Sequence, residues 1–312
     1  MDVFSAEHFR NEDAARDILE RVLWPDGSVC PFCGVIGRAY ATKKRGVFRC
    51  AEPKCRKDFT VTTKTVMERS HIALHKWLQG FHLMAASKKG CSAHQLHRML
   101  NITYRSAWFM AHRIREAMRA GGLTPPMGGD GGFVEIDETF IGRKKDTPLR
   151  TGYEHKHAVL TLVDRKGEAS SFHIDRADTK NVMPIVRKNV AKEARVVTDE
   201  AGQYAHLHED VAEHQVVRHA KGEYGRGEWH TNTIEGFFSI FKRGMKGVYQ
   251  HCDEKHLHRY LAEFDFRYSN RVALGIGDGE RAARAVKGGK GKRLMYRQPN
   301  GQVSPNGSAE IS

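Results

Sequence analysis

Residues 133–141 read Phe-Val-Glu-Ile-Asp-Glu-Thr-Phe-Ile, and this stretch decides the fold. Apolar and polar side chains alternate along it, which is the period of a half-buried β-strand. Further strands are expected at 158–163, 170–174 and 194–198, and helices at 181–192, 231–245 and 253–268. Strands first and helices mostly afterwards predict a mixed α/β domain over residues 133–286.

The chain before this domain divides into three parts. Residues 1–65 are expected to hold a short helix, with helical spacing from Ser5 to Leu23, followed by a cysteine-rich segment. Residues 66–120 keep a helical pattern, in which Ser92 opens one helix and a turn at 100–103 leads into a basic helix at 104–119. This is the outline of a helix-turn-helix region. The Gly/Pro-rich residues 121–132 are a linker, and the Gly/Lys/Ser-rich residues 287–312 are expected to form a disordered basic tail.

Charge points to a polyanionic partner. The 312 residues include 51 Lys and Arg against 37 Asp and Glu, a formal net charge of +14 at pH 7. No apolar run approaches the ~20 residues of a membrane span, and the first residues lack a signal sequence. A soluble, cytoplasmic protein without a membrane partner is therefore expected.

Four of the six cysteines form two pairs near the N-terminus: Cys30, Cys33, Cys50 and Cys55. Four thiolates in this arrangement can enclose one structural Zn²⁺ with no position left for water. Reduced thiols or disulfides are the alternatives, and the clustered, paired spacing favours zinc. Cys91 and Cys252 are expected to have core or capping roles.

Three carboxylates in the α/β domain are candidates for catalysis: Asp137 within the first strand, Asp199 after the strand at 194–198, and Glu235 on the helix at 231–245. Converging carboxylates repel one another unless cations lie between them, and Mg²⁺ or Mn²⁺ prefers oxygen ligands. Two such ions can activate an attacking oxygen and stabilise a leaving oxygen at phosphorus. Lys242 lies two helical turns after Glu235 on the same face. A solvated helix face with ordinary charges remains the alternative explanation.

These segments together resemble the DDE transposases of bacterial insertion sequences that carry an N-terminal zinc ribbon, the ISXO2-like group. The matching residues are 24–27 and 30–34, 133–142, 197–200, the motif His-Thr-Asn-Thr-Ile-Glu-Gly-Phe-Phe-Ser at 230–239, and 241–244. The resemblance implies a ribonuclease H-like mixed sheet flanked by helices. It also implies that Asp137, Asp199 and Glu235 bind two Mg²⁺ ions and that Lys242 lies near the DNA backbone. Asn232 is a rival or auxiliary to Glu235, and His230 opens the motif.

The resulting hypothesis is an insertion-sequence transposase. It would bind the terminal inverted repeats of double-stranded DNA, cleave the element end and join the released 3′-hydroxyl to target DNA. The resemblance implies a homo-oligomer in a synaptic complex. Candidate DNA contacts are Lys242 and Arg243 in the catalytic domain and Arg105, His112, Arg113 and Arg115 on the basic helix.

Two rival functions stay open at this point. The first is a DNA-binding regulator with a zinc ribbon, a helix-turn-helix and an inactive transposase-like domain. The second, a zinc hydrolase, is disfavoured because His208 and His214 are not spaced as in a helical HExxH motif. A nucleotide cofactor is not expected either, since the sequence contains no G-x-x-x-x-G-K-[ST] loop.

Overall fold

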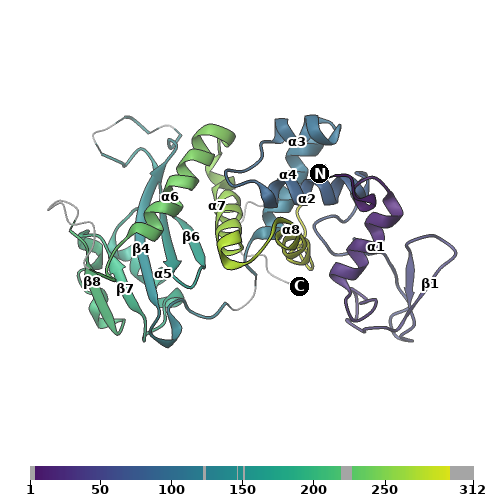
Figure 1. Cartoon of the computed structure of the whole chain (residues 1–312), viewed down its shortest axis with the longest axis horizontal. Coiled ribbons are helices and arrows are strands. Elements are labelled where there is room, and N and C mark those ends of the chain that lie inside the picture. The colour runs from purple at the N-terminus through teal and green to yellow at the C-terminus, as the bar shows by residue number, and fades with distance from the viewer. Residues whose placement is uncertain (1–3, 122–123, 146, 150–151, 219–226, 296–312) are drawn as a thin grey trace.

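The computed structural model describes residues 4–121, 124–145, 147–149, 152–218 and 227–295. The N-terminal segment lies at one end of the molecule, the large sheet at the other, and a group of helices between them (Figure 1). Short helical segments connect the larger elements in the described part of the chain: 3₁₀ turns at Gly129–Gly131, Gly202–Tyr204, Leu207–Glu209 and Val272–Leu274, and a π-helical turn at Met245–Tyr249.

The N-terminal segment pairs one helix with a small antiparallel sheet. Its elements are a 3₁₀ turn at Glu7–Phe9, α1 (Glu12–Leu23), β1 (Ala39–Ala41), β2 (Phe48–Cys50) and β3 (Asp58–Phe59), with strand order β1-β2-β3. The helix starts later than its apolar spacing suggested. Asn11 ends the preceding turn and caps α1, because its side-chain oxygen accepts the amide hydrogens of Asp13 and Ala14 at 2.8 and 3.2 Å.

The helical region confirms the expected succession of helices and turn. Its elements are α2 (Leu74–Ala86), α3 (Ala93–Leu100) and α4 (Tyr104–Met118). The Ser92 hydroxyl accepts the Gln95 amide hydrogen at 3.1 Å, and Thr103 caps α4 in the same way. Between them Asn101 takes the left-handed conformation, with φ 48°, which ends α3 and turns the chain into α4.

The α/β domain contains the predicted mixed sheet. Its strands are β4 (Phe133–Ile141), β5 (His157–Asp164), β6 (Ala169–Ile174), β7 (Arg195–Thr198) and β8 (Glu213–Val216), in the order β6-β5-β4-β7-β8. The first three strands pair antiparallel, whereas β7 and β8 add on parallel to β4. This arrangement confirms the expected mixed sheet; β8 is the strand that hydropathy alone did not reveal.

Helices cover both faces of this sheet. Val182 and Val186 of α5 (Thr179–Asn189) pack with Val134 and Ile136 on one face. On the other face, α6 (Asn232–Gly244) and α7 (Glu254–Ser269) bury a stripe that includes Ile234, Phe237, Phe238 and Phe241 against Val159 and Val163. The residues of β4 that point toward α6 are therefore the odd-numbered ones, Glu135 and Asp137 among them.

The last helix belongs to the helical region, so the boundary expected at residue 286 needs correction. Ala285 and Val286 of α8 (Asp278–Lys287) lie in the same core as Trp77 and Phe81 of α2. The sequence placed these residues in the catalytic domain because no composition change separates them from α7. The chain therefore leaves the α/β domain after α7 and returns to the helices, as Figure 1 shows.

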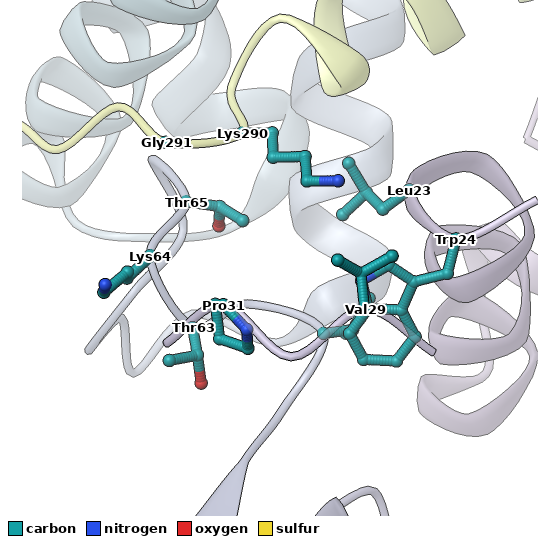
Figure 2. A pocket seen from close by; sticks show the side chains of 10 residues that line it. Leu23, Trp24, Val29, Pro31, Thr63, Lys64, Thr65, Lys290 and Gly291 are labelled. Atoms are coloured by element: carbon teal, nitrogen blue, oxygen red, sulfur yellow. The ribbon is translucent and has the colours of Figure 1, made fainter. Parts of the chain in front are cut away.

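The first part of the expected basic tail is ordered. Lys290 forms a β-bridge with Thr65, and the Gly291 amide donates to the carbonyl of Lys64 at 2.8 Å. Both residues line a cavity of about 120 Å³ with Trp24, Val29 and their neighbours (Figure 2). Residues 296–312 of the expected tail lie outside the described residues, as do 122–123 of the linker.

The second half of the expected linker is part of the α/β domain. The Met127 amide donates to the carbonyl of Asn189, and the Gly128 amide donates to a carboxylate oxygen of Asp164 at 3.0 Å. Within the described residues, no helix combines the length and the apolar character needed to cross a membrane.

Candidate active site

Two of the three predicted catalytic acids lie side by side because of the sheet register. Residues 133, 134 and 135 of β4 pair with 195, 196 and 197 of the parallel strand β7. Two residues further on, this register places Asp137 level with Asp199, which immediately follows β7. Parallel neighbouring strands thus present both carboxylates at one point of the sheet.

A third carboxylate, Glu138, completes a cluster of acids. One side-chain oxygen each of Asp137, Glu138 and Asp199 lies within 4.8 Å of the other two, and all three residues are half-buried. The Tyr204 hydroxyl donates to Glu138 at 2.5 Å and the Gln203 amide group donates at 3.0 Å. Glu138 was not predicted as a site residue, although its position directly after Asp137 was the available signal.

The cluster is electrostatically strained without a cation. Burial raises the pKa of Asp137 to about 7, and the negative charges of Asp199 and Glu138 act in the same direction. The Glu138 amide, which donates to Asp137 at 2.7 Å, and the cation Lys242 both lower that pKa. Burial also raises the pKa of Glu138. Oxygens bound to one Mg²⁺ at about 2.0–2.1 Å lie roughly 3–4 Å apart, so small side-chain movements would let this cluster hold such an ion.

Glu235 and Asn232 lie on α6 and outside this group of three acids. Both are exposed, and the Thr231 hydroxyl donates to Glu235 at 2.9 Å. Asn232 lines a cleft of about 580 Å³, whose walls also include Lys88 and Arg267. Lys242 lies two turns after Glu235 and is near enough to Asp137 to influence its pKa, so this side of α6 faces the acids.

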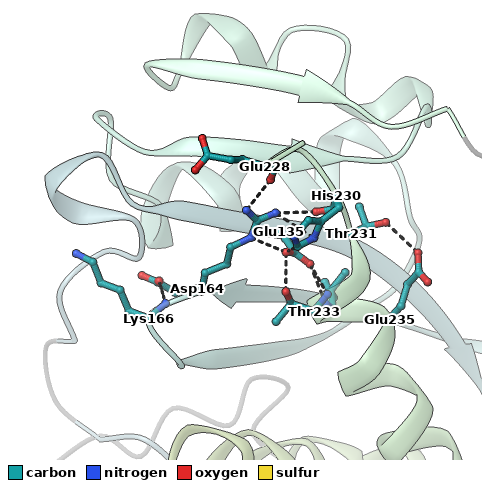
Figure 3. A network of polar contacts seen from close by, with 10 residues as sticks. Glu135, Asp164, Lys166, Glu228, His230, Thr231, Thr233 and Glu235 are labelled. Carbon is teal, nitrogen blue, oxygen red and sulfur yellow. Dashed lines mark hydrogen bonds and ion pairs between the residues drawn. The ribbon is translucent and has the colours of Figure 1, made fainter. Parts of the chain in front are cut away.

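The start of α6 is attached to β4 by a buried carboxylate, Glu135, which is 0% exposed. It accepts the amide hydrogens of Thr233 and Ile234, each at 2.9 Å, at the positive end of the helix (Figure 3). Arg165 pairs with the same carboxylate at 2.8 Å and donates to the carbonyl of His230 at 3.0 Å. His230 therefore belongs to the contacts that hold the start of α6, and it is not part of the acid cluster.

The four predicted zinc ligands converge in the N-terminal segment. Their sulfurs lie within 4.8 Å of one another, with 3.7 Å between Cys30 and Cys55 and 3.6 Å between Cys33 and Cys50. A zinc tetrahedron with bonds of ~2.3 Å has edges of about 3.8 Å, so the sulfur positions fit a structural Zn²⁺. Burial alone would raise the pKa of Cys30, but the amides of Phe32 and Cys33 lower it to about 7. This favours the thiolate that a metal needs.

The arginines of the basic helix have two different environments. Arg105 is exposed at the start of α4. Arg115 is 2% exposed, pairs with Glu263 of α7 at 2.7 Å and lies over the ring of Tyr260. Arg113 is 8% exposed and donates to the carbonyl of Glu68 at 3.0 Å.

The burial of these side chains argues against part of the expected DNA contacts. His112 is 1% exposed, and burial lowers its pKa to about 2, so it is uncharged at neutral pH. Arg113 and Arg115 hold α4 against its neighbours. The helical pattern of basic residues did not distinguish these inward positions from Arg105, because their partners, Glu68 for Arg113 and Glu263 for Arg115, are distant in sequence.

The chain thus combines a four-cysteine ribbon with a mixed sheet that gathers carboxylates, and both parts match known families. Two protein families match along the chain: the ISXO2-like transposase domain at residues 130–269 and the transposase zinc-ribbon domain at residues 10–58. The chain therefore carries an ISXO2-like transposase domain and a transposase zinc-ribbon domain, as its motifs suggested.

One relative agrees with these family matches. A protein of Halobacterium salinarum, described as an uncharacterized protein in transposable element ISH50, is 28% identical over 280 residues, covering 83% of this chain and 91% of that protein. A solved simian T-cell lymphotropic virus intasome in complex with PP2A regulatory subunit B56 gamma matches 70% of this chain and 77% of its own. Its identity is 13% and its TM-score 0.32, so that second similarity carries no argument.

Proposed function

We propose that this chain binds the ends of an insertion sequence and catalyses cleavage and strand transfer of double-stranded DNA with Mg²⁺ or Mn²⁺. The proposal rests on the acid cluster of Asp137, Glu138 and Asp199. One carboxylate oxygen of each residue lies within 4.8 Å of the other two, inside the matched transposase domain. A raised pKa at Asp137 fits a group whose charge is stabilised by a bound cation.

The chemistry divides between the metal and the side chains. When bound, a pair of divalent ions would supply charge neutralisation at the attacking and leaving oxygens. Asp137 and Asp199 would hold the ions, and Glu235 would complete the ligand set from α6. Glu138 is already held by Tyr204 and Gln203, so we assign it a supporting charge. Asn232 remains the alternative to Glu235.

DNA would lie along α6 beside the acids. Lys242 and Arg243 are exposed on this helix, where a phosphodiester backbone approaching Asp137 would meet them. Arg105 would contribute from α4, with the zinc ribbon, to recognition of the terminal repeats. Binding two element ends would require a homo-oligomer, and the protein would act on DNA in the cytoplasm.

The direct test is cleavage of a labelled duplex that carries the flanking element end. Wild type should nick this duplex with Mg²⁺ and fail when Mg²⁺ is omitted, and Asp137→Asn should lose nicking while it retains DNA binding by fluorescence anisotropy. Glu193→Gln removes an exposed carboxylate and is the matched control. Loss of DNA binding in Asp137→Asn would instead assign Asp137 a structural role.

Two further variants assign the third ligand. Nicking lost in Glu235→Gln and kept in Asn232→Ala would identify Glu235, and the opposite result would identify Asn232. DNA binding by wild type with no nicking under any metal condition would favour the regulator with an inactive transposase-like domain.

A further inference from the structure

A second group of metal-binding side chains lies on the sheet away from the catalytic acids. His157 begins β5, His173 lies on β6, and Glu254 is the first residue of α7. His173 pairs with Val159, two residues along β5 from His157, so both histidines point to the face that α7 covers. One ligand atom of each of the three residues lies within 4.8 Å of the other two.

Both histidines direct a nitrogen at the same carboxylate oxygen. His157 Nδ1 and His173 Nε2 each lie 3.8 Å from Glu254 Oε1. Both distances exceed that of a hydrogen bond. His157 is 5% exposed, and neither of these buried nitrogens has a hydrogen-bond partner among the described residues. Buried ring nitrogens without partners are unfavourable, so the arrangement calls for a group between the three side chains.

The spacing suits a small metal ion better than it suits direct contact. Zinc bonds of about 2.0–2.2 Å to nitrogen and oxygen place tetrahedral ligand atoms roughly 3.3–3.5 Å apart. The two observed distances of 3.8 Å exceed this by a few tenths of an ångström, and the two histidine nitrogens lie within 4.8 Å of each other, so side-chain movements of about 1 Å or less would close the site. Glu254 has a side chain that is 53% exposed, which leaves an open side where water could complete the coordination.

We propose that His157, His173 and Glu254 bind a second Zn²⁺, separate from the ribbon zinc and from the catalytic acids. Two imidazoles and one carboxylate form a donor set that zinc accepts readily. His157 pairs with Ile141, four residues beyond Asp137 on β4, which separates the two sites by about 13 Å along the strand.

This ion would connect the β5–β6 hairpin to the first turn of α7. The same helix packs on α4 of the helical region through the Arg115–Glu263 ion pair. A zinc ion at its N-terminus would therefore hold α7 in position between the catalytic sheet and the DNA-binding helices. Although water would complete its coordination, its role would be to hold these elements together, since none of its ligands belongs to the acid cluster.

The test is the zinc content of the full chain, dialysed against Zn²⁺ and then against metal-free buffer and measured by mass spectrometry. Wild type should hold two zinc ions per chain, and His173→Gln and Glu254→Gln should each hold one. His208→Gln, an exposed histidine elsewhere, and Asp137→Asn should still hold two. A wild type with one zinc, or variants that keep two, would overturn the proposal.

A second measurement covers the case in which a variant folds poorly. Added Zn²⁺ should raise the melting temperature of wild type and His208→Gln, because an ion that binds only the folded state stabilises it. His173→Gln and Glu254→Gln should show a smaller increase, the part due to the ribbon site alone, even where their melting temperatures without added zinc equal that of wild type. An equal zinc-dependent increase in these variants would also overturn the proposal.

Discussion

The carboxylate of Glu135 holds Thr233 by two hydrogen bonds, one to the backbone amide at 2.9 Å and one to the side-chain hydroxyl at 2.8 Å. Glu135 lies two residues before Asp137 on β4, and Thr233 lies two residues before Glu235 on α6. This attachment therefore fixes the offset between the strand and the helix that carry two of the proposed catalytic acids.

Replacing this carboxylate should destabilise the α/β domain. Glu135→Gln removes a fully buried charge that balances Arg165 and the positive end of α6, and breaking such a pair costs about 3–5 kcal/mol. Denaturant unfolding should report the loss. Glu168→Gln, an exposed carboxylate on the adjoining turn, should change stability by less than about 0.5 kcal/mol. Equal stability of the two variants would contradict the proposed attachment.

Lys242→Ala should move the pH dependence of cleavage. Asp137 must lose its proton to bind a divalent ion, and its pKa of about 7 is already lowered by Lys242. Removing this cation raises that pKa, so activity should fall further at about pH 6.5 than at about pH 8.5. Initial nicking rates across this range test the shift. Lys188→Ala removes the same charge from α5, on the opposite face of the sheet, and should leave the profile unchanged.

The sequence predicted most of the fold because its elements have strong local signals. Apolar and polar residues alternate at 134–137 within the apolar-flanked segment 133–141, and β4 has the bounds of that segment. Ser92 and Thr103 are good helix caps and begin the predicted helices. Four cysteines in two pairs likewise predicted a cluster without any knowledge of tertiary structure.

The remaining features depend on contacts between distant residues. Glu138 joins Asp137 and Asp199 only because Tyr204 and Gln203, after β7, reach back to it. Arg115 is buried because Glu263 covers it, and a helical pattern of charges does not show which face another helix will cover. His157 and His173 converge through strand pairing, which spacing along the chain does not reveal.

Arg115 and Arg105 should separate into a structural and a DNA-binding residue, although both lie on α4. Arg115→Leu leaves the buried carboxylate of Glu263 with one fewer partner and should cost about 3–5 kcal/mol of stability. Arg105→Ala should leave the melting temperature nearly unchanged and weaken binding of the element end. Melting curves and anisotropy titrations at two salt concentrations distinguish them; unaltered DNA affinity in Arg105→Ala would remove this residue from the interface.

Zinc removal should act first on the N-terminal segment. A chelator should increase hydrogen exchange in β1, β2 and β3, because a three-stranded sheet this small has little core besides Phe59 and its cysteines. The amides of β4 and β7 should keep their protection. Exchange that stays slow in the small sheet after zinc is lost would show that it folds without the metal.

In the absence of Mg²⁺, the acid cluster should make the protein less stable as pH rises. Asp137 has a pKa of about 7 in the folded state, well above that of an unfolded aspartate near 4, so the folded state binds more protons between these values. Stability therefore falls as pH increases from about 4 to 7, and the decrease reaches at most roughly 4 kcal/mol for this group. Asp137→Asn carries no such charge, so in magnesium-free buffer that retains zinc it should be more stable than wild type at about pH 7.5 and similar at about pH 4.

Added Mg²⁺ should stabilise wild type and reduce this difference, because the ion compensates the charges of Asp199 and Glu138 together with Asp137. Denaturant titrations of wild type and Asp137→Asn at both pH values, with and without Mg²⁺, measure the free energy of unfolding under each of these conditions. If the variant is less stable than wild type at the higher pH without Mg²⁺, Asp137 stabilises the fold.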